Sequence, residues 1–226
     1  MTRDRIVELD LPDLDPSTSL RLVPWLRRAV AQGLVGGAEP TDHLRHALGM
    51  AAAVEHDRGG APTAFLDLGS GGGLPGMVLL ERWPGARATL LDASSRRAAF
   101  LQAEVDQLGW DARVEVRQGR AEELGHDPDL RERFPVVTAR SFGAPAVTAE
   151  CGAPFLEVGG SLVVAEPPDA DPDARWPRDG VMQLGLDRGP LIRCGASVTL
   201  QVLWKVRPSA SSEPRGVGRP AKRPRF

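Results

Sequence analysis

Short apolar segments alternate with longer amphipathic ones through the middle of this sequence, from residue 64 to residue 165. Continuous apolar runs such as AFLDL and ATLL predict buried strands, and apolar residues three and four positions apart predict helices. The predicted strands cover 64–68, 88–91, 113–117, 136–139 and 161–165, and the predicted helices cover 76–82, 95–108, 121–124 and 144–156. Strands that alternate with helices predict an α/β fold, in which helices cover both faces of a parallel sheet.

The two ends of the chain have different patterns. The first sixty residues predict a helical extension: SLRLVPWLRRAVAQGL has helical spacing interrupted by Pro24, and a second helix follows with Thr41 as its N-cap. After Pro190, LIRCGASVTLQVLWKV predicts one or two further strands. The last twenty residues hold four prolines and six Lys or Arg, which predicts a basic, poorly structured tail. We therefore divide the chain into an extension (1–60), an α/β domain (61–206) and a tail (207–226).

The sequence FLDLGSGGGLPG, residues 65–76, places five glycines in eight positions directly after the first strand of the alternating unit. Glycine allows backbone angles and close approaches that a side chain prevents. Ligands of such sheets bind beyond the carboxyl ends of the strands. We therefore expect Gly69, Gly71 and Gly73 to turn tightly and to present backbone N–H groups to a ligand. A tight turn without a ligand is the alternative, although a simple turn does not need five glycines.

Two kinds of cofactor fit this loop, namely nicotinamide dinucleotides and S-adenosylmethionine. The spacing Gly71-x-Gly73-x-x-Gly76 matches the dinucleotide fingerprint, and Asp92 ends the second strand, where its carboxylate could bind the ribose hydroxyls of either cofactor. Pro75, however, lacks the N–H that a pyrophosphate would use at the start of a helix. The negative charge of Asp67 suits the sulfonium and amino groups of S-adenosylmethionine. The residues therefore favour S-adenosylmethionine.

Composition and charge argue against several other classes of function. The sequence has no tyrosine, so it lacks the Tyr/Lys pair of short-chain dehydrogenases. His43 and His46 share a predicted helix, but no Cys or carboxylate cluster completes a metal site, and we expect them on a solvated face. A net charge of −2 argues against general nucleic-acid affinity but allows local basic patches. The two separated cysteines, the missing signal peptide and the absence of a long apolar run predict a reduced cytoplasmic protein without a membrane span.

Several segments together resemble the bacterial glucose-inhibited division protein B family: FLDLGSGGGLPGMVLL, ATLLDASSRRAAFLQAEVDQLG, VRQGRAEEL, VVTARSF and the closing PRGVGRPAKRP. Members of that family use S-adenosylmethionine to methylate N7 of a guanine in 16S ribosomal RNA. The resemblance implies a class I S-adenosylmethionine-dependent methyltransferase sheet, which is Rossmann-like, behind the helical N-terminal extension. It also implies that Gly69 and Leu74 line the cofactor, that Ala121 and Glu122 bracket its adenine, and that Arg140 is the basic residue at the end of the fourth strand.

The sequence also departs from the family. Glu166 stands where the family usually has a lysine, and the N-terminal region lacks the signature expected there. Guanine N7 has an exposed lone pair, so its methylation needs positioning rather than a general base. Arg140 is the expected catalytic residue, holding the methionine carboxylate, an RNA phosphate or the target base; a structural ion pair is its alternative. The expected partner is ribosomal RNA or the 30S subunit. Methylation of a small molecule or another RNA, and non-catalytic binding of cofactor or RNA, stay open.

Overall fold

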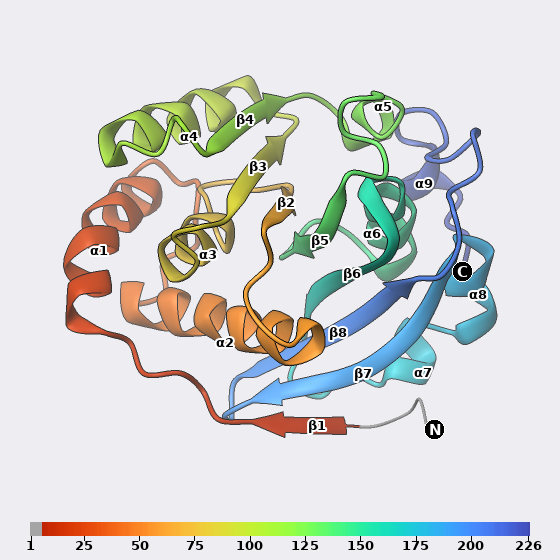
Figure 1. Ribbon diagram of the computed structural model, residues 1–226, viewed down its shortest axis with the longest axis horizontal. Helices are drawn as coiled ribbons and strands as arrows, with labels where there is room; N and C mark the ends of the chain where they lie inside the picture. The colour runs from red at the N-terminus through yellow and green to blue at the C-terminus, as the bar shows by residue number, and fades with distance from the viewer. Residues whose placement is uncertain (1–5) are drawn as a thin grey trace.

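The computed structural model describes residues 6–226, and a mixed sheet of eight strands runs through their centre (Figure 1). The strands are β1 (Ile6–Leu9), β2 (Ala64–Leu68), β3 (Arg87–Asp92), β4 (Val114–Gln118), β5 (Phe134–Ala139), β6 (Leu156–Glu166), β7 (Leu186–Cys194) and β8 (Val198–Lys205). Their order is β1-β7-β8-β6-β5-β2-β3-β4. Within residues 6–226, β8 alone runs antiparallel to its neighbours.

Helices cover both faces of this sheet. One face carries α1 (Pro16–Ala31), α2 (Pro40–Arg58), α3 (Gly76–Arg82) and α4 (Ser95–Leu108); the other carries α5 (Ala121–Leu124), α6 (Pro145–Gly152), the short α7 (Pro172–Arg175), α8 (Arg178–Gln183) and α9 (Arg219–Lys222). Successive strand residues alternate between the two cores, as the pleat of a strand requires: Phe65 packs in the first and Leu66 in the second. A strand whose successive residues are apolar is therefore buried on both faces of the sheet.

The central elements agree closely with the prediction. The strand predicted at 64–68 and the helices predicted at 76–82, 95–108 and 121–124 have the predicted bounds. The strands expected after Pro190 are β7, which begins earlier, at Leu186, and β8. The helix predicted at 144–156 is shorter. It ends at Gly152 and passes through a 3₁₀ turn, η1 (Ala153–Phe155), directly into β6. Pro154 lies inside that turn, and it has no N–H with which to continue an α-helix.

The N-terminal prediction needs three corrections. Residues 6–9 form the edge strand β1, paired with β7 about 185 positions further along the chain, so the extension is not helical throughout. Helix α1 continues through Pro24, and it begins at Pro16 with an Asp15 cap that accepts from the Thr18 N–H. Helix α2 begins at Pro40, so Thr41 is not its N-cap. Residues 1–5 of the predicted extension lie outside the described residues, and its boundary at residue 60 stays a prediction.

The prediction of a poorly structured tail is wrong. The segment 207–226 runs along the α6 and α8 side of the sheet and includes α9. Arg215 forms an ion pair with Glu150, whose side chain is fully buried, and the Phe226 ring packs against Trp176. Composition did not indicate this order because the buried partners lie on other elements.

The topology sets the position of the site. The chain passes from β2 outward to β3 and β4, and then returns to the other side of β2 to form β5 and β6. The strand order therefore reverses between β2 and β5. In open α/β sheets ligands bind at such a reversal, outside the carboxyl ends of the strands.

Candidate active site

The glycine loop follows β2 and closes on the end of β3. Gly69 and Gly71 have φ angles of +72° and +58°, which favour glycine. The Gly69 N–H donates to Leu91 O (2.8 Å), the Gly71 N–H to Asp92 Oδ2 (2.9 Å) and the Gly73 N–H to Ser70 O (2.7 Å). The expectation that these N–H groups face a ligand is wrong, because all three donate to groups within the protein.

Each glycine of the loop meets a different steric demand. A Cβ on Gly69 would lie 2.6 Å from the Phe142 ring, which therefore packs directly over the loop. A Cβ on Gly73 would lie 2.6 Å from Met77 and 2.9 Å from Trp25, in the core below the loop. Gly73 thus allows helix packing and lines none of the three pockets described next. A Cβ on Gly76 would meet Leu90 at 2.6 Å, so this glycine brings α3 close to the sheet.

Three pockets adjoin one another along the carboxyl edge of the sheet. We call them the loop pocket (Leu34, Val35, Gly36, His43, Gly69, Ser70, Gly71, Gly72, Leu74, Arg97, Arg140, Ser141), the α5–α6 pocket (Gly69, Leu91, Ala93, Gly119, Arg120, Ala121, Glu122, Phe142, Gly143, Ala144, Val147, Cys151, Ala221) and the α2–β6 pocket (His46, Arg140, Ser141, Phe142, Gly143, Thr148, Val164, Ala165, Glu166, Pro167, Arg175).

Neighbouring pockets share residues. Gly69 lines the loop pocket and the α5–α6 pocket, and Arg140 lines the loop pocket and the α2–β6 pocket. Phe142 and Gly143 line the α5–α6 pocket and the α2–β6 pocket. Together the three pockets form one continuous candidate site.

The two aspartates of the site are engaged by the protein in different ways. Asp92 Oδ2 accepts from the Gly71 N–H and Oδ1 from the Ser94 N–H (2.8 Å), so its carboxylate ties the loop to β3. Asp67 is fully buried, and it accepts from Thr138 Oγ1 (2.9 Å) and from the Gly76 N–H (3.2 Å). Burial raises the pKa of Asp67 to about 6 despite these donors. Neither aspartate lines any of the three pockets, and direct contact of either one with a cofactor stays a prediction.

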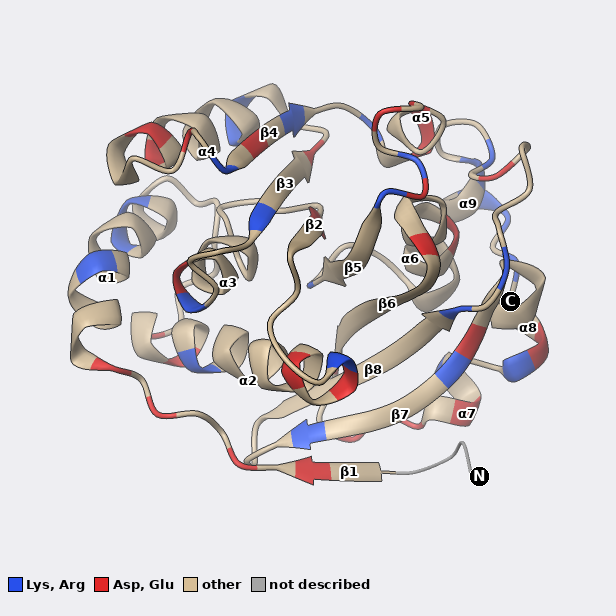
Figure 2. Cartoon of the chain, viewed as in Figure 1, with Lys and Arg blue, Asp and Glu red and all other residues tan. Residues whose placement is uncertain are grey.

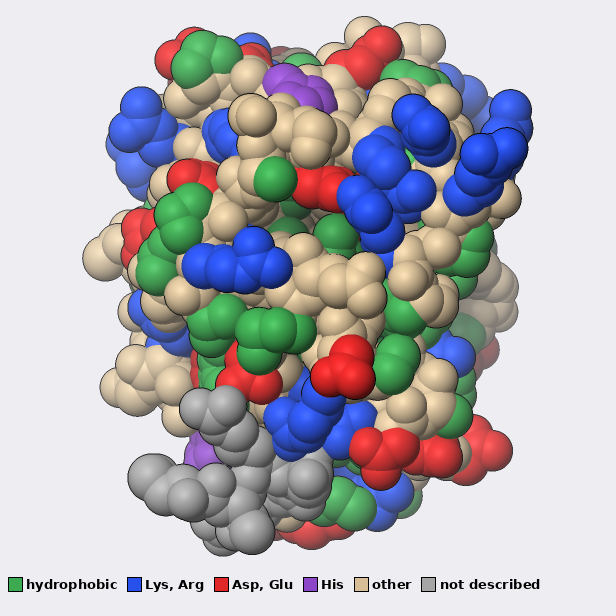
Figure 3. All heavy atoms as spheres, turned by 90° about the vertical axis from the view of Figure 1, so that its right-hand side faces the viewer, with side chains coloured by type: hydrophobic (Ala, Val, Ile, Leu, Met, Phe, Trp, Pro, Cys, Tyr) green, Lys and Arg blue, Asp and Glu red, His purple; other side chains and the backbone are tan. Residues whose placement is uncertain are grey.

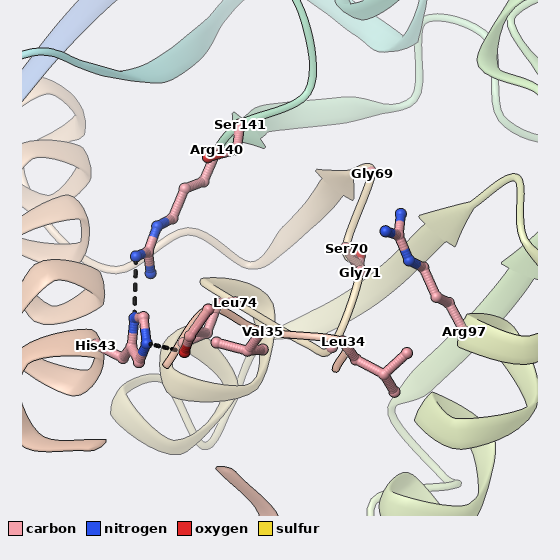
Figure 4. A pocket seen from close by; sticks show the side chains of 12 residues that line it. Leu34, Val35, His43, Gly69, Ser70, Gly71, Leu74, Arg97, Arg140 and Ser141 are labelled. Carbon is pink, nitrogen blue, oxygen red and sulfur yellow. Dashed lines mark hydrogen bonds between the residues drawn. The ribbon is translucent and has the colours of Figure 1, made fainter. Parts of the chain in front are cut away.

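Arg140 follows β5 and reaches toward α2 (Figure 4). Its Nη2 donates to His43 Nδ1 (3.1 Å), so His43 is protonated at Nε2, which donates to Gly36 O (2.9 Å). Burial lowers the pKa of Arg140, and its Nη1 is buried without a hydrogen-bond partner among the described residues. The guanidinium forms no ion pair within residues 6–226, which counts against the structural alternative. The loop of residues 34–36 completes this wall of the pocket.

The two histidines are not on a solvated helix face, so that expectation is wrong. His43 is 6% exposed, and His46 lines the α2–β6 pocket. Burial, assisted by the charge of Arg140, lowers the pKa of His46 to about 4, so it is neutral near pH 7. The sequence did carry a signal for this: both residues lie among the apolar positions of α2, beside Leu44 and Ala47.

Glu166 contributes no free negative charge to the site. Its carboxylate pairs with Arg175 and accepts from Trp176 Nε1 (3.1 Å), and its side chain is 1% exposed. Arg175, on α7, lines the same pocket with a side chain that is 35% exposed. The acidic residue Glu166, which stands where the family usually has a lysine, is therefore paired with a nearby arginine. The sequence alone did not reveal this pairing.

Ala121 and Glu122 both line the α5–α6 pocket, as expected of residues near one ligand. Glu122 accepts from Arg120 Nη2 (2.9 Å) and from the Gly218 N–H (3.0 Å). Burial alone would raise the pKa of Glu122, but these donors outweigh it and lower the pKa. Phe142 and Cys151, which sequence reasoning missed, add apolar surface to the pocket. Phe142 ends the segment VVTARSF, which carries part of the family resemblance, whereas nothing local in the sequence marked Cys151, which lies beside Ala121 only in the folded chain.

Two kinds of feature are absent from the described part of the chain. No group of three or more His, Cys, Asp or Glu side chains within residues 6–226 is placed to hold a metal ion. In the same part of the chain, no helix combines the length and apolarity needed to cross a bilayer.

Solved structures identify the fold as that of a class I methyltransferase. An O-methyltransferase from Bacillus cereus, solved in complex with SAH, superposes with a TM-score of 0.58 at 16% identity over 86% of this chain and 92% of its own. A putative O-methyltransferase from Klebsiella pneumoniae gives 0.56 at 16% identity over 87% and 93%. At such low identity these likenesses concern the fold alone, and they confirm the predicted fold class.

Sequence relatives identify the family. Residues 27–167 match GidB, described as rRNA small subunit methyltransferase G. "Ribosomal RNA small subunit methyltransferase G" of Roseiflexus castenholzii is 37% identical over 171 residues, which are 74% of this chain and 72% of the relative. Its namesake in Parasynechococcus marenigrum is 35% identical over 164 residues, 70% of this chain and 66% of the relative. The chain belongs to the GidB family, which confirms the predicted family, enzyme class and S-adenosylmethionine cofactor.

Proposed function

We propose that this protein transfers a methyl group from S-adenosylmethionine to N7 of a guanine in 16S ribosomal RNA, with the 30S subunit as substrate. The observation that carries the proposal is the junction of three pockets at Gly69, Phe142 and Arg140, in a chain of the GidB family. We assign the α5–α6 pocket to the nucleoside of the cofactor, the loop pocket to its amino-acid group and the α2–β6 pocket to the incoming base, because all three meet at the switch point of the sheet.

The lining of the α5–α6 pocket fits the adenosine part of the cofactor. Ala121, Phe142, Val147 and Cys151 offer apolar surface to a flat base, and Asp92 lies at the adjoining end of β3, where its carboxylate has acceptor capacity left for ribose hydroxyls. Gly69 lines both this pocket and the loop pocket, and the Phe142 ring packs over it where the two pockets meet. When bound, S-adenosylmethionine supplies an electrophilic methyl group on a sulfonium.

The residues around the junction position the reactants rather than move protons. Guanine N7 attacks with its own lone pair, so no side chain has to remove a proton first. Arg140 carries a positive charge between the loop pocket and the α2–β6 pocket, and His43 fixes its guanidinium in place. We assign Arg140 to hold either the carboxylate of the methionine part or the target base. Neutral His46 lets RNA approach without adding a second buried charge.

A labelled transfer assay tests this function. The protein is incubated with methyl-labelled S-adenosylmethionine and 30S subunits that lack the modification, with naked 16S RNA and total small metabolites in parallel. Nucleoside mass spectrometry should find 7-methylguanosine in the RNA. Arg140→Gln should reduce transfer at least about tenfold, the loss from one missing charged hydrogen bond. Arg87→Gln, at the amino end of β3 and far from the site, is the matched control and should be normal.

The outcomes separate the alternatives. Label in another RNA nucleoside would overturn the N7 assignment, and label confined to small metabolites would favour the small-molecule enzyme. Cofactor binding in calorimetry without transfer to any substrate would favour a non-catalytic binding protein.

A further inference from the structure

The C-terminal segment, residues 207–226, is anchored to the α5–α6 side of the sheet along its length. Arg131 donates to the carbonyls of Glu213 (2.7 Å) and Ser209 (3.1 Å), and His126 Nε2 bonds to Pro214 O (2.8 Å). Arg215 binds the buried carboxylate of Glu150 through both its backbone and its side chain. These contacts hold α9 in a defined place beside α6.

One side of the anchored segment forms part of the candidate site. Ala221, on α9, lines the α5–α6 pocket together with Ala121 and Glu122. The Gly218 N–H, directly before α9, donates to Glu122 Oε1 (3.0 Å), which fixes α9 against the wall that Glu122 belongs to. The pocket is thus closed by residues about 100 positions apart in the sequence.

The other side of the segment carries unpaired positive charge. Arg219, Lys222 and Arg223 are exposed, and none of the three forms an ion pair with any residue from 6 to 226. Of the other tail arginines, Arg215 and Arg225 are paired with Glu150 and Glu213, and Arg207 donates to the carbonyls of Met182 and Gln183. Figure 2 shows the basic residues around α9, and Figure 3, which faces this side of the molecule, shows Lys and Arg side chains gathered over its upper right part.

Charge and position indicate what binds this outer side. The protein carries a net charge of −2, so three unpaired cations within five residues are a local exception rather than part of a basic surface. Closely spaced Lys and Arg side chains bind the phosphates of nucleic acids, and the binding weakens with salt because counterions are released. The ribosomal RNA of the proposed function supplies such phosphates.

We propose that the C-terminal segment has two coupled roles: Ala221 closes the nucleoside end of the cofactor pocket, while Arg219, Lys222 and Arg223 bind phosphates of the RNA substrate. This inference rests on the proposed function and extends it. Because both roles belong to one short helix, phosphate contacts add to the protein contacts that hold α9 in its closing position. RNA therefore raises the affinity for the cofactor, and the cofactor raises the affinity for RNA by the same factor.

Two sets of variants separate the two sides. The outer-side variant is the triple substitution Arg219→Gln, Lys222→Gln and Arg223→Gln. Its matched control replaces three exposed arginines that lie away from α9 and form no ion pair within residues 6–226, namely Arg27, Arg58 and Arg87. The inner-side variant is Ala221→Phe, which places a large ring at the wall of the α5–α6 pocket. Its control is Ala221→Ser, whose side chain is nearly the same size as that of alanine.

Three measurements on the full-length chain test the proposal: calorimetry with S-adenosylhomocysteine alone, the same titration with saturating 16S RNA, and RNA affinity over a salt series. The wild type should bind the cofactor at least about fivefold more tightly with RNA present, the low end of common coupling factors. The outer triple variant should keep its cofactor affinity without RNA and lose this gain. Its slope of log affinity against log salt should become shallower by up to about 2–3, at about 0.7–0.9 for each phosphate contact.

The inner variant should behave in the opposite way. Ala221→Phe should bind the cofactor at least tenfold more weakly without RNA, at a melting temperature equal to that of Ala221→Ser. Unchanged cofactor affinity in Ala221→Phe, an unchanged salt slope in the outer triple variant, or an equal loss of slope in the control triple variant would each overturn the proposal. A wild type that shows this coupling but transfers no methyl group to RNA would overturn the proposed function and leave this inference standing.

Discussion

The ion pair between Arg215 and Glu150 tests whether the C-terminal segment stabilises the fold. The Glu150 side chain is fully buried, and it accepts from the Arg215 N–H (3.0 Å), Nε (2.7 Å) and Nη2 (2.6 Å). Burial alone would raise the pKa of Glu150, but the bonds and the charge of Arg215 lower it. Arg215→Ala removes the positive partner and leaves a buried carboxylate with a single remaining donor from Arg215, its backbone N–H.

The expected cost follows from this geometry. Removing one partner of a buried ion pair costs about 3–5 kcal/mol, because the other charge stays buried without compensation. The Arg215 side chain is 17% exposed, so water reaches part of the site and the low end, about 3 kcal/mol, applies. For a chain of this size such a loss lowers the melting temperature by about 6–12 °C.

Urea denaturation at pH 7 measures this cost. Arg219→Ala, an exposed tail arginine without an ion pair, is the matched control and should change the free energy of unfolding by less than about 0.5 kcal/mol. The double variant Arg215→Met, Glu150→Leu should recover most of the loss, since it buries no charge. A cost below about 1 kcal/mol for Arg215→Ala would refute the reasoning, and the tail would then be a loosely attached extension.

Three other predictions concern the glycine loop and its aspartates. Asp92→Asn keeps the side-chain volume but removes the charge, so S-adenosylmethionine affinity should fall by about 1.5–3 kcal/mol in calorimetry; an equal loss for a 2′,3′-dideoxy analogue would show that Asp92 acts through the loop and not on the ribose. Burial raises the pKa of Asp67 from 3.8 to about 6, so the folded protein binds this proton more tightly, and the stability that the protonated carboxyl contributes is lost as pH rises from about 4 to 7. The stability of Asp67→Asn relative to wild type should therefore improve over that range in urea denaturation, and a constant difference would contradict this sign. Gly71→Val should fold but not bind cofactor. The nearest atom to a Cβ at this position is 3.8 Å away, so the cost to folding comes from the φ angle of +58° and not from a steric clash. Unchanged affinity in a folded variant would exclude the loop from the site.

Local sequence patterns predicted the central sheet because its strands are buried on both faces. Such strands are continuous apolar runs, and the run AFLDL needed no knowledge of its neighbours to be recognised as β2. The carboxyl ends of parallel strands meet at one edge, so the order of strands and helices also predicted that Gly69, Asp92 and Arg140 would converge there.

Residues whose structure depends on distant partners were predicted less well. β1 is a strand because it pairs with β7, and the tail is ordered because Glu150 and Trp176 receive its side chains. Neither partner is near in sequence, so apolar spacing predicted a helical extension in one case and composition predicted a poorly structured tail in the other. Pairing and burial outweigh local propensity in both cases.

The site shows the same division. The sequence by itself determined that a glycine-rich turn, Asp92 and Arg140 lie at the carboxyl edge of the sheet, because their positions follow from the strand ends. Only the tertiary structure decided what those groups bind: Asp92 holds the Gly71 N–H, His43 orients Arg140, and Phe142 packs over Gly69. Hydrogen bonds and ring packing act over 3–4 Å between residues that the chain brings together only on folding, and no local pattern records them.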